Sequence, residues 1–177
     1  MNIEYECRIL EINKEEFIKK LELLEAIKKG EYFQKRYTYD FNPKIENKWI
    51  RLRTNGNKNT LTIKDITNKH SISGTKELEI EVSDFDKTNE ILKELGYNFR
   101  NYQENERITY LLNGVEIDID SWPLIPTYVE IEGHSEEEVR NIIDILDIKN
   151  NITTLDVTSI YNDIYNIDIL SIKELMF

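Results

Sequence analysis

Charged and apolar residues alternate along the short extended segments of this chain, and this pattern limits the fold more than any other feature. Side chains of a strand alternate between its faces, so every second residue shares a side. The charged or polar rows are Glu4, Glu6 and Arg8; Arg51 and Arg53 with Trp49; Lys64 with Thr60 and Thr62; Glu77, Glu79 and Glu81; Arg107 with Asn105 and Thr109; Asp118 and Asp120; and Glu130 and Glu132 with Tyr128. The opposite faces are apolar, as in Leu78, Ile80 and Val82.

Any single row fits the solvent face of a half-exposed sheet. As a set, however, the rows separate into acidic and basic strands, whereas a solvated surface mixes both signs. The apolar faces need cover, which amphipathic helices can supply from outside. We therefore predict an α+β fold in which an eight-stranded antiparallel sheet closes into a barrel, a tunnel with a charged lumen, and the helices pack outside it.

The periodicity of the chain predicts the order of these elements. Asn55-Gly56 and Asn113-Gly114 are typical of hairpin turns, and Asn13 and Ser135 are suitable helix caps. Helices are predicted at 14–28, 84–95, 135–147 and, as a short piece, 156–165. Strands are predicted at 3–9, 34–41, 48–54, 60–66, 75–82, 102–112, 115–120 and 127–132.

Composition narrows the class of protein. The 177 residues fit one domain, 1–177, and the net charge of −11 argues against a nucleic-acid partner. No run of 18 apolar residues and no signal-peptide pattern is present, so we expect a cytoplasmic protein without a membrane partner, as a monomer or homodimer. The single cysteine, Cys7, excludes an internal disulfide and is expected to be a packed core thiol.

The mixed charges of the rows suggest a particular ligand. Clustered arginines and lysines bind phosphate oxygens, and clustered carboxylates bind hard cations such as Mg²⁺ or Mn²⁺. Phosphoryl transfer uses both kinds of group. His70 and His134 lack partners at zinc spacing, so we interpret them as surface residues.

Several motifs occur in the order found in one enzyme family. Glu4-Tyr5-Glu6-Cys7-Arg8 resembles the ExExK signature of the CYTH superfamily, which includes thiamine triphosphatases, inorganic triphosphatases and class IV adenylate cyclases. The later matches are Trp49–Arg53 for the RxR strand, Leu61–Lys64 for the TxK strand, Lys76–Glu81 for a basic and acidic strand, Glu106–Tyr110 for an arginine strand, and Asp120 followed by Glu130 and Glu132. The resemblance runs from about residue 3 to residue 135.

The resemblance implies an active site inside the tunnel that holds a triphosphate-bearing small molecule. Phosphate oxygens would be bound by Arg8, Arg51, Arg53, Lys64, Lys76 and Arg107. Glu4, Glu6 and Arg8 would be catalytic, and Mg²⁺ or Mn²⁺ would be held by Glu79, Asp120, Glu130 and Glu132.

Two departures from the family pattern stand out. Arg8 occupies the place of the signature lysine; it keeps the charge but cannot transfer a proton. In the second strand, where relatives often have QxDxYFD, Arg36 replaces an acid and Thr38 an aromatic residue.

Three functions fit the pattern. We expect a metal-dependent triphosphatase, because the histidine–phenylalanine pair of the cyclase branch has no counterpart here. The alternatives are an adenylate cyclase that converts ATP to cyclic AMP and pyrophosphate, and a non-catalytic binder of polyphosphate or nucleotide. Trp122 either packs or stacks on an organic ring of the substrate.

Overall fold

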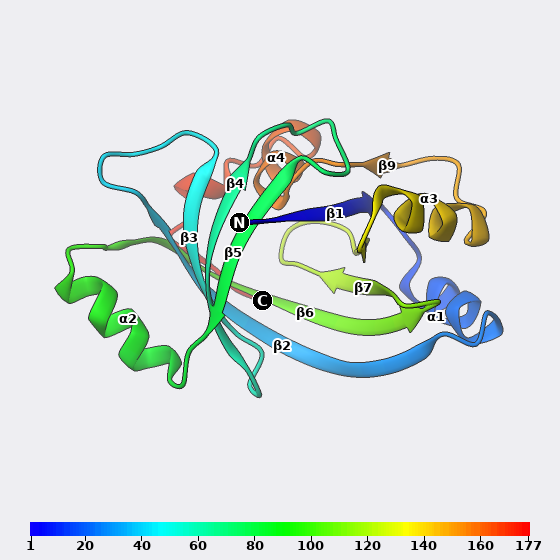
Figure 1. The fold of residues 1–177 in the computed structure, drawn as a ribbon, viewed down its shortest axis with the longest axis horizontal. Coiled ribbons are helices and arrows are strands. Elements are labelled where there is room, and N and C mark those ends of the chain that lie inside the picture. The colour runs from blue at the N-terminus through cyan, green and yellow to red at the C-terminus, as the bar shows by residue number, and fades with distance from the viewer.

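Eight long strands form a continuous antiparallel circuit in the computed structural model, which describes residues 1–177. Hydrogen bonding runs in the order β6-β2-β3-β4-β5-β1-β8-β7, and β7 pairs with β6 to close the barrel. The strands are β1 (Asn2–Ile9), β2 (Ile27–Asp40), β3 (Lys48–Thr54), β4 (Asn59–Ile66), β5 (Thr75–Glu81), β6 (Phe99–Leu112), β7 (Val115–Ser121) and β8 (Tyr128–Gly133). Two short strands, β9 (Ile152–Thr153) and β10 (Glu174–Leu175), join β1 and β6. The predicted closed barrel is confirmed (Figure 1).

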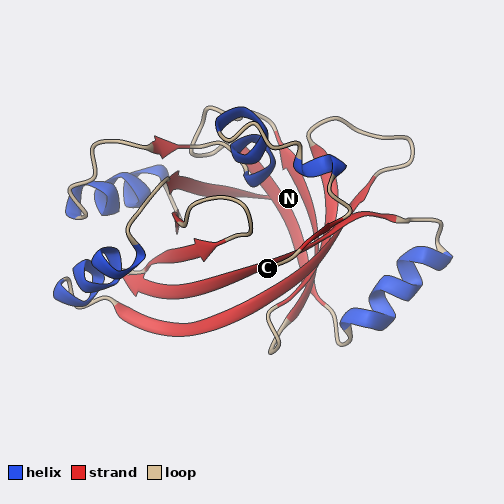
Figure 2. Cartoon of the chain, turned by 180° about the vertical axis from the view of Figure 1, so that it is seen from behind, coloured by secondary structure: helices blue, strands red, loops and turns tan.

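Four helices lie mostly outside this barrel, as predicted (Figure 2). They are α1 (Lys14–Leu23), α2 (Phe85–Glu94), α3 (Glu136–Ile145) and the short α4 (Val157–Ser159), which continues into a π-helical turn at Ile160–Ile164. The side chains of Asn13 and Ser135 cap α1 and α3 by accepting backbone N–H groups of the first turn. Both asparagine–glycine turns are confirmed, and in the second one Asn113 and Gly114 have positive φ angles of 53° and 87°.

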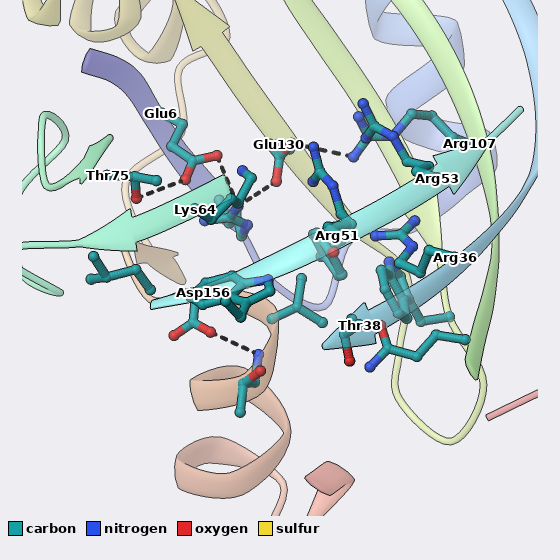
Figure 3. A pocket seen from close by; sticks show the side chains of 18 of the residues that line it. Glu6, Arg36, Thr38, Arg51, Arg53, Lys64, Thr75, Arg107, Glu130 and Asp156 are labelled. Carbon is teal, nitrogen blue, oxygen red and sulfur yellow. Dashed lines mark hydrogen bonds and ion pairs between the residues drawn. The ribbon is translucent and has the colours of Figure 1, made fainter. Parts of the chain in front are cut away.

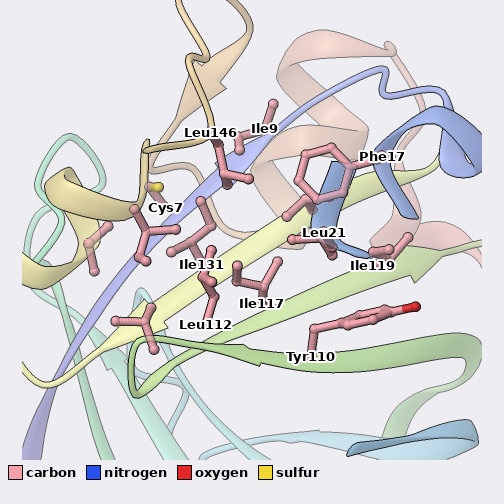
Figure 4. Close-up of a cluster of buried hydrophobic side chains, with 14 of the residues drawn as sticks. Cys7, Ile9, Phe17, Leu21, Tyr110, Leu112, Ile117, Ile119, Ile131 and Leu146 are labelled. Carbon is pink, nitrogen blue, oxygen red and sulfur yellow. The ribbon is translucent and has the colours of Figure 1, made fainter. Parts of the chain in front are cut away.

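The apolar core lies between the barrel wall and the outer helices, not in the lumen. The largest cluster joins Cys7, Ile117 and Ile131 of β1, β7 and β8 to Leu21 of α1 and Val139 of α3 (Figure 4). A second cluster packs the C-terminal segment beside Trp122, and a third holds α2 against β2 and β3. Because alternate residues must then face inward, the burial of this core turns the charged rows into the lumen.

Two predicted boundaries are wrong at the N-terminal helix. The apolar spacing predicts a helix over 14–28, but α1 ends at Leu23 and Glu25 has a φ of 57°. Ile27 begins β2 instead, where it is 62% exposed, and β2 starts seven residues before the predicted 34. Pairing of β2 with the full length of β6 outweighs the helical periodicity of a few residues.

The expected cover of the apolar strand faces by helices is missing on part of β5. Leu78 and Ile80 on its outer face are 51% and 57% exposed, and Ile3 of the neighbouring β1 is 47% exposed.

None of the helices combines the length and the apolar composition that a membrane-spanning helix requires.

Cys7 is expected to resist alkylation while the protein is folded. Its side chain is fully buried, and this burial raises the pKa of the thiol to about 12, so the reactive thiolate is roughly a ten-thousandth of the population at pH 8. Iodoacetamide labelling followed by mass spectrometry should show modification at least about a hundred times slower than in urea. Equal labelling rates in the two conditions would refute the packed environment.

Candidate functional site

The charged rows meet in one cavity inside the tunnel (Figure 3). Seven cationic side chains line it, against three carboxylates. The cations are Arg8, Arg36, Arg51, Arg53, Lys64, Arg100 and Arg107, and the carboxylates are Glu6, Glu130 and Asp156. Because the whole chain carries a net charge of −11, this excess of positive charge is local to the cavity.

One wall of the cavity is formed by β3, β4 and β5. Cross-strand register places Arg51 opposite Thr62, and Thr62 opposite Glu79. The Arg51 guanidinium donates to Glu77 at 2.8 Å, and Lys64 Nζ lies 3.0 Å from a Glu4 carboxylate oxygen. The predicted convergence of basic and acidic rows is therefore present on this wall.

The other wall is centred on two arginines that share one carboxylate. Arg8 lies 2.5 Å from Glu130 and 2.8 Å from Glu6, and Arg107 lies 3.2 Å from Glu130. Arg107 also forms ion pairs with Asp118 and Asp120 at 2.5 and 2.6 Å. Every one of these pairs is at least partly buried, so screening by water is weak.

These contacts shift the protonation equilibria of the carboxyl groups in opposite directions. Burial opposes ionisation of Glu130, but Arg8 and Arg107 outweigh it and hold the pKa of Glu130 below its ordinary value. Burial, together with the negative charges of Glu130, Glu4 and Glu6, raises the pKa of Glu132 to about 8. Glu132 forms no ion pair that offsets this effect.

The predicted metal ligands do not form a ready-made cation site. Asp120 and Glu130 are ion-paired with arginine, and Glu79 lies on the opposite wall, where Thr62 and Arg51 donate to it. No three carboxylate, thiolate or imidazole side chains converge closely enough to hold a metal ion. Of the four predicted ligands only Glu132 is free of an ion pair, while Glu79, Asp120 and Glu130 are paired with arginines, so this donor set does not fit a resident Mg²⁺ or Mn²⁺.

Most predicted phosphate ligands share the cavity, but Lys76 does not. Arg8, Arg51, Arg53, Lys64 and Arg107 all line it. Lys76 is exposed and alternates with Glu77 and Glu79, so it lies on the outer face of β5 with Leu78. Of the three catalytic candidates, Glu6 and Arg8 line the cavity, whereas Glu4 does not and instead accepts a hydrogen bond from Lys64.

Arg36 and Trp122 are site residues whose roles the sequence left undefined. Arg36 lines the cavity from β2, and its guanidinium lies 4.5 Å from the centre of the Trp122 ring. Trp122 is 4% exposed and packs edge-on against Tyr161, so its ring is not free to stack on a substrate. The sequence did contain a signal for Arg36: polar residues at 34, 36 and 38 alternate with Tyr37 and Tyr39, which predicts a shared face. The structure buries all three polar residues of that face.

The closed strand circuit and the charged cavity inside it define a β-tunnel protein with a polar interior. A CYTH domain profile matches residues 2–161, so the chain belongs to the CYTH family. This family contains enzymes. The structural neighbours of the chain include proteins described as putative adenylate cyclases, one of them with a dominant triphosphatase activity.

Solved structures of several organisms share this fold. A conserved hypothetical protein from Pyrococcus furiosus has a TM-score of 0.75 and 24% identity, covering 87% of this chain and 97% of its own. A protein from Pyrococcus horikoshii has a TM-score of 0.74 and 25% identity, covering 86% and 95%. A Hippeastrum protein described as a putative adenylyl cyclase with a dominant triphosphatase activity has a TM-score of 0.63 and 14% identity, covering 92% and 96%. No protein of curated function matches the sequence.

Proposed function

We propose that this protein hydrolyses triphosphate-bearing small molecules, such as inorganic triphosphate, thiamine triphosphate or a nucleoside triphosphate. The observation that carries the proposal is the cavity with seven cations and three carboxylates in a chain of net charge −11. Such a cavity favours a compact and highly charged anion, because buried cations interact with it more strongly than surface cations do.

The two walls would hold the phosphate groups between them. Arg51, Arg53 and Lys64 approach from β3 and β4, while Arg8 and Arg107 approach from β1 and β6. In the absence of an anion, these cations are balanced by Glu4, Glu77, Glu79 and Glu130. Phosphate oxygens are bidentate acceptors for guanidinium groups and would take over part of this pairing.

Glu6 is our candidate for orienting the attacking water. It lines the cavity, whereas Glu4 does not, and its two oxygens accept from Arg8 at 2.8 Å and from Thr75 at 3.4 Å. The water oxygen would form a bond to the terminal phosphorus as the anhydride P–O bond breaks and Glu6 accepts the proton. Arg8 would hold Glu6 in place and stabilise the negative charge that develops on phosphate oxygens.

The proposed Mg²⁺ or Mn²⁺ dependence follows from the substrate and not from a site on the protein. Triphosphates carry divalent cations in solution, and Mg²⁺ commonly reaches proteins with the substrate phosphates as most of its ligands. Since three of the four candidate ligands, Glu79, Asp120 and Glu130, are paired with arginines, we propose that the metal enters as its triphosphate complex.

Hydrolysis is favoured over cyclisation by the lining of the cavity. Trp122, the candidate for stacking on an organic ring, is covered by Arg36 and packed against Tyr161. Seven cations line the cavity against three aromatic rings, Trp49, Trp122 and Tyr128, so phosphate ligands exceed aromatic surface. A cyclase would additionally have to orient the ribose of ATP for attack on the α-phosphorus.

One assay separates the candidate activities. The purified protein is incubated with tripolyphosphate, thiamine triphosphate or ATP in the presence of Mg²⁺ or Mn²⁺, and phosphate, pyrophosphate and cyclic AMP are resolved chromatographically. We expect orthophosphate as a product. Cyclic AMP as the main product from ATP would show a cyclase, and binding without turnover of any substrate would show a non-catalytic binder.

Replacement of Glu6 by glutamine should uncouple binding from turnover. The amide keeps the shape of the side chain but cannot accept the proton of water, so kcat should fall about 100-fold or more. The Kd for tripolyphosphate should change less than about tenfold, because Glu6 is a carboxylate and is not itself a ligand of the phosphate groups. Glu15→Gln on the exposed start of α1 is the control, and an unchanged kcat for Glu6→Gln would remove Glu6 from the mechanism.

A further inference from the structure

Arg36 is a buried cation without a carboxylate partner. Its residue is 6% exposed, yet it forms none of the ion pairs that balance Arg8, Arg51, Lys64 and Arg107. One nitrogen, Nη2, donates to two neutral amides, Gln34 at 2.8 Å and Asn105. The buried Nε has no hydrogen-bond partner, and Nη1 donates none either.

The surroundings of Arg36 add repulsion to this lack of a counter-ion. Arg53 lies directly opposite on β3, and Arg51 follows two residues earlier on the same face. Burial lowers the pKa of Arg36 well below its ordinary value, and the charges of Arg53, Arg51 and Arg107 lower it further. An unpaired charge in such a place is costly unless an anion completes it.

The two amide acceptors, the charge of Asp120 and the indole ring of Trp122 compensate for part of this cost. The ring lies 4.5 Å from the guanidinium and is held by Tyr161 and the C-terminal segment. It fixes the plane of the guanidinium through a cation–π contact and leaves the remaining N–H groups without acceptors. Arg36 is thus preorganised and incompletely bonded within the cavity that also contains Arg51 and Arg53 (Figure 3).

The register of β2 and β3 shows at which end of the cavity Arg36 acts. Along β3 the inward side chains run from Trp49 through Arg51 to Arg53, and Arg36 lies across from Arg53 while Asp40 lies across from Trp49. Two apolar residues, Ile66 and Val157, also line the cavity. Ile66 belongs to the Trp49 end, because it lies on β4 two residues beyond Lys64, which pairs with Trp49. The Arg36 end is polar and cationic, so it is unsuited to an organic substituent.

We propose that Arg36 is an additional phosphate-binding residue, which holds the terminal phosphate group of the substrate at the Arg53 end of the cavity. The proposal deepens the proposed function, since it assigns a place to one phosphate of the same triphosphate. An organic substituent, where the substrate has one, then points toward Trp49. This chain consequently favours substrates with a free, doubly ionised terminal phosphate.

The test measures binding, so that it does not depend on turnover. Tripolyphosphate is titrated calorimetrically into wild type, Arg36→Gln, Arg36→Lys and the control Arg140→Gln, in EDTA at pH 8. Arg140 is an exposed residue of α3, and its replacement by glutamine removes the same net charge as Arg36→Gln does. We expect Arg36→Gln to weaken binding at least about 30-fold, Arg36→Lys to recover part of the loss, and Arg140→Gln to change Kd less than about twofold.

Thermal unfolding without ligand distinguishes a phosphate-binding role from a structural one. Because Arg36 is buried among like charges, Arg36→Gln should leave Tm unchanged or higher, whereas a structural arginine would lower it. A lowered Tm together with an unchanged tripolyphosphate Kd would overturn the proposal.

A fluorescence measurement covers the case in which Arg36→Gln does not fold. Trp49 and Trp122 are the two tryptophans of the chain, so Trp49→Phe leaves Trp122 as the reporter beside Arg36. Tripolyphosphate should alter its emission as the guanidinium engages the anion. Calorimetric binding without any change of emission would contradict the proposal for Arg36. Binding that changes the emission, in a protein that turns over no triphosphate, would refute the proposed hydrolysis and leave the role of Arg36 standing.

Discussion

Arg107→Ala is expected to lower the free energy of unfolding by about 3 to 5 kcal/mol. Arg107 is the shared partner of Asp118, Asp120 and Glu130, at 2.5 to 3.2 Å. Asp118 and Asp120 have side chains that are 2% and 0% exposed, so water cannot replace the lost cation. Removal of one partner from a buried ionic group typically costs this much, because an uncompensated charge remains.

Urea denaturation monitored by circular dichroism would measure the effect of Arg107→Ala. Arg140→Ala is the matched control, because Arg140 pairs with Glu136 on the exposed surface of α3, where the loss should be below about 0.5 kcal/mol. A loss of similar size in both variants would mean that the Arg107 cluster is solvated and contributes little to stability.

Lys64→Gln is expected to weaken tripolyphosphate binding by roughly 30- to 100-fold, and Lys76→Gln is expected to leave it within about twofold. Both lysines lie on neighbouring strands, and the resemblance to the CYTH superfamily assigned both to phosphate. The structure separates them. Lys64 has a side chain that is 12% exposed and lines the cavity, whereas Lys76 is exposed on the outer face of β5.

Calorimetric titration of tripolyphosphate into the two lysine variants would test this difference, with circular dichroism to verify that both are folded. The two substitutions remove the same charge from the whole chain, so a nonspecific electrostatic effect predicts equal losses. Equal losses of affinity would therefore argue against binding inside the cavity. A loss confined to Lys76→Gln would place the anion on the outer face.

Strand periodicity was sufficient to predict most of the barrel and most of the cavity. The rows containing Glu6, Arg51 and Arg107 face inward because the intervening residues, such as Cys7, Leu52 and Ile108, are apolar and buried. The same reasoning assigns Lys76 to the face of Leu78, opposite Glu77. The similarity of Lys76–Glu81 to a family motif conflicted with the periodicity there, and the periodicity was the better guide.

The pairing of individual charges could not be predicted from the sequence. Glu130 contacts Arg107 across 23 positions of the chain and Arg8 across 122, and the distances depend on barrel closure. The expected metal ligands Asp120 and Glu130 are held by arginines for this reason. Local pattern determines the face of each residue, but not its neighbour on another strand.

The alternation of charged and apolar residues along the strands determined the fold class, because successive side chains of a strand point to opposite faces of the sheet. It also determined that the interior is charged, since the apolar faces supply the core under α1 and α3. Only the tertiary structure decided that Arg36 lacks a counter-ion and that Trp122 supports it. Those properties depend on strand register around a closed barrel, where residues 86 positions apart come into contact.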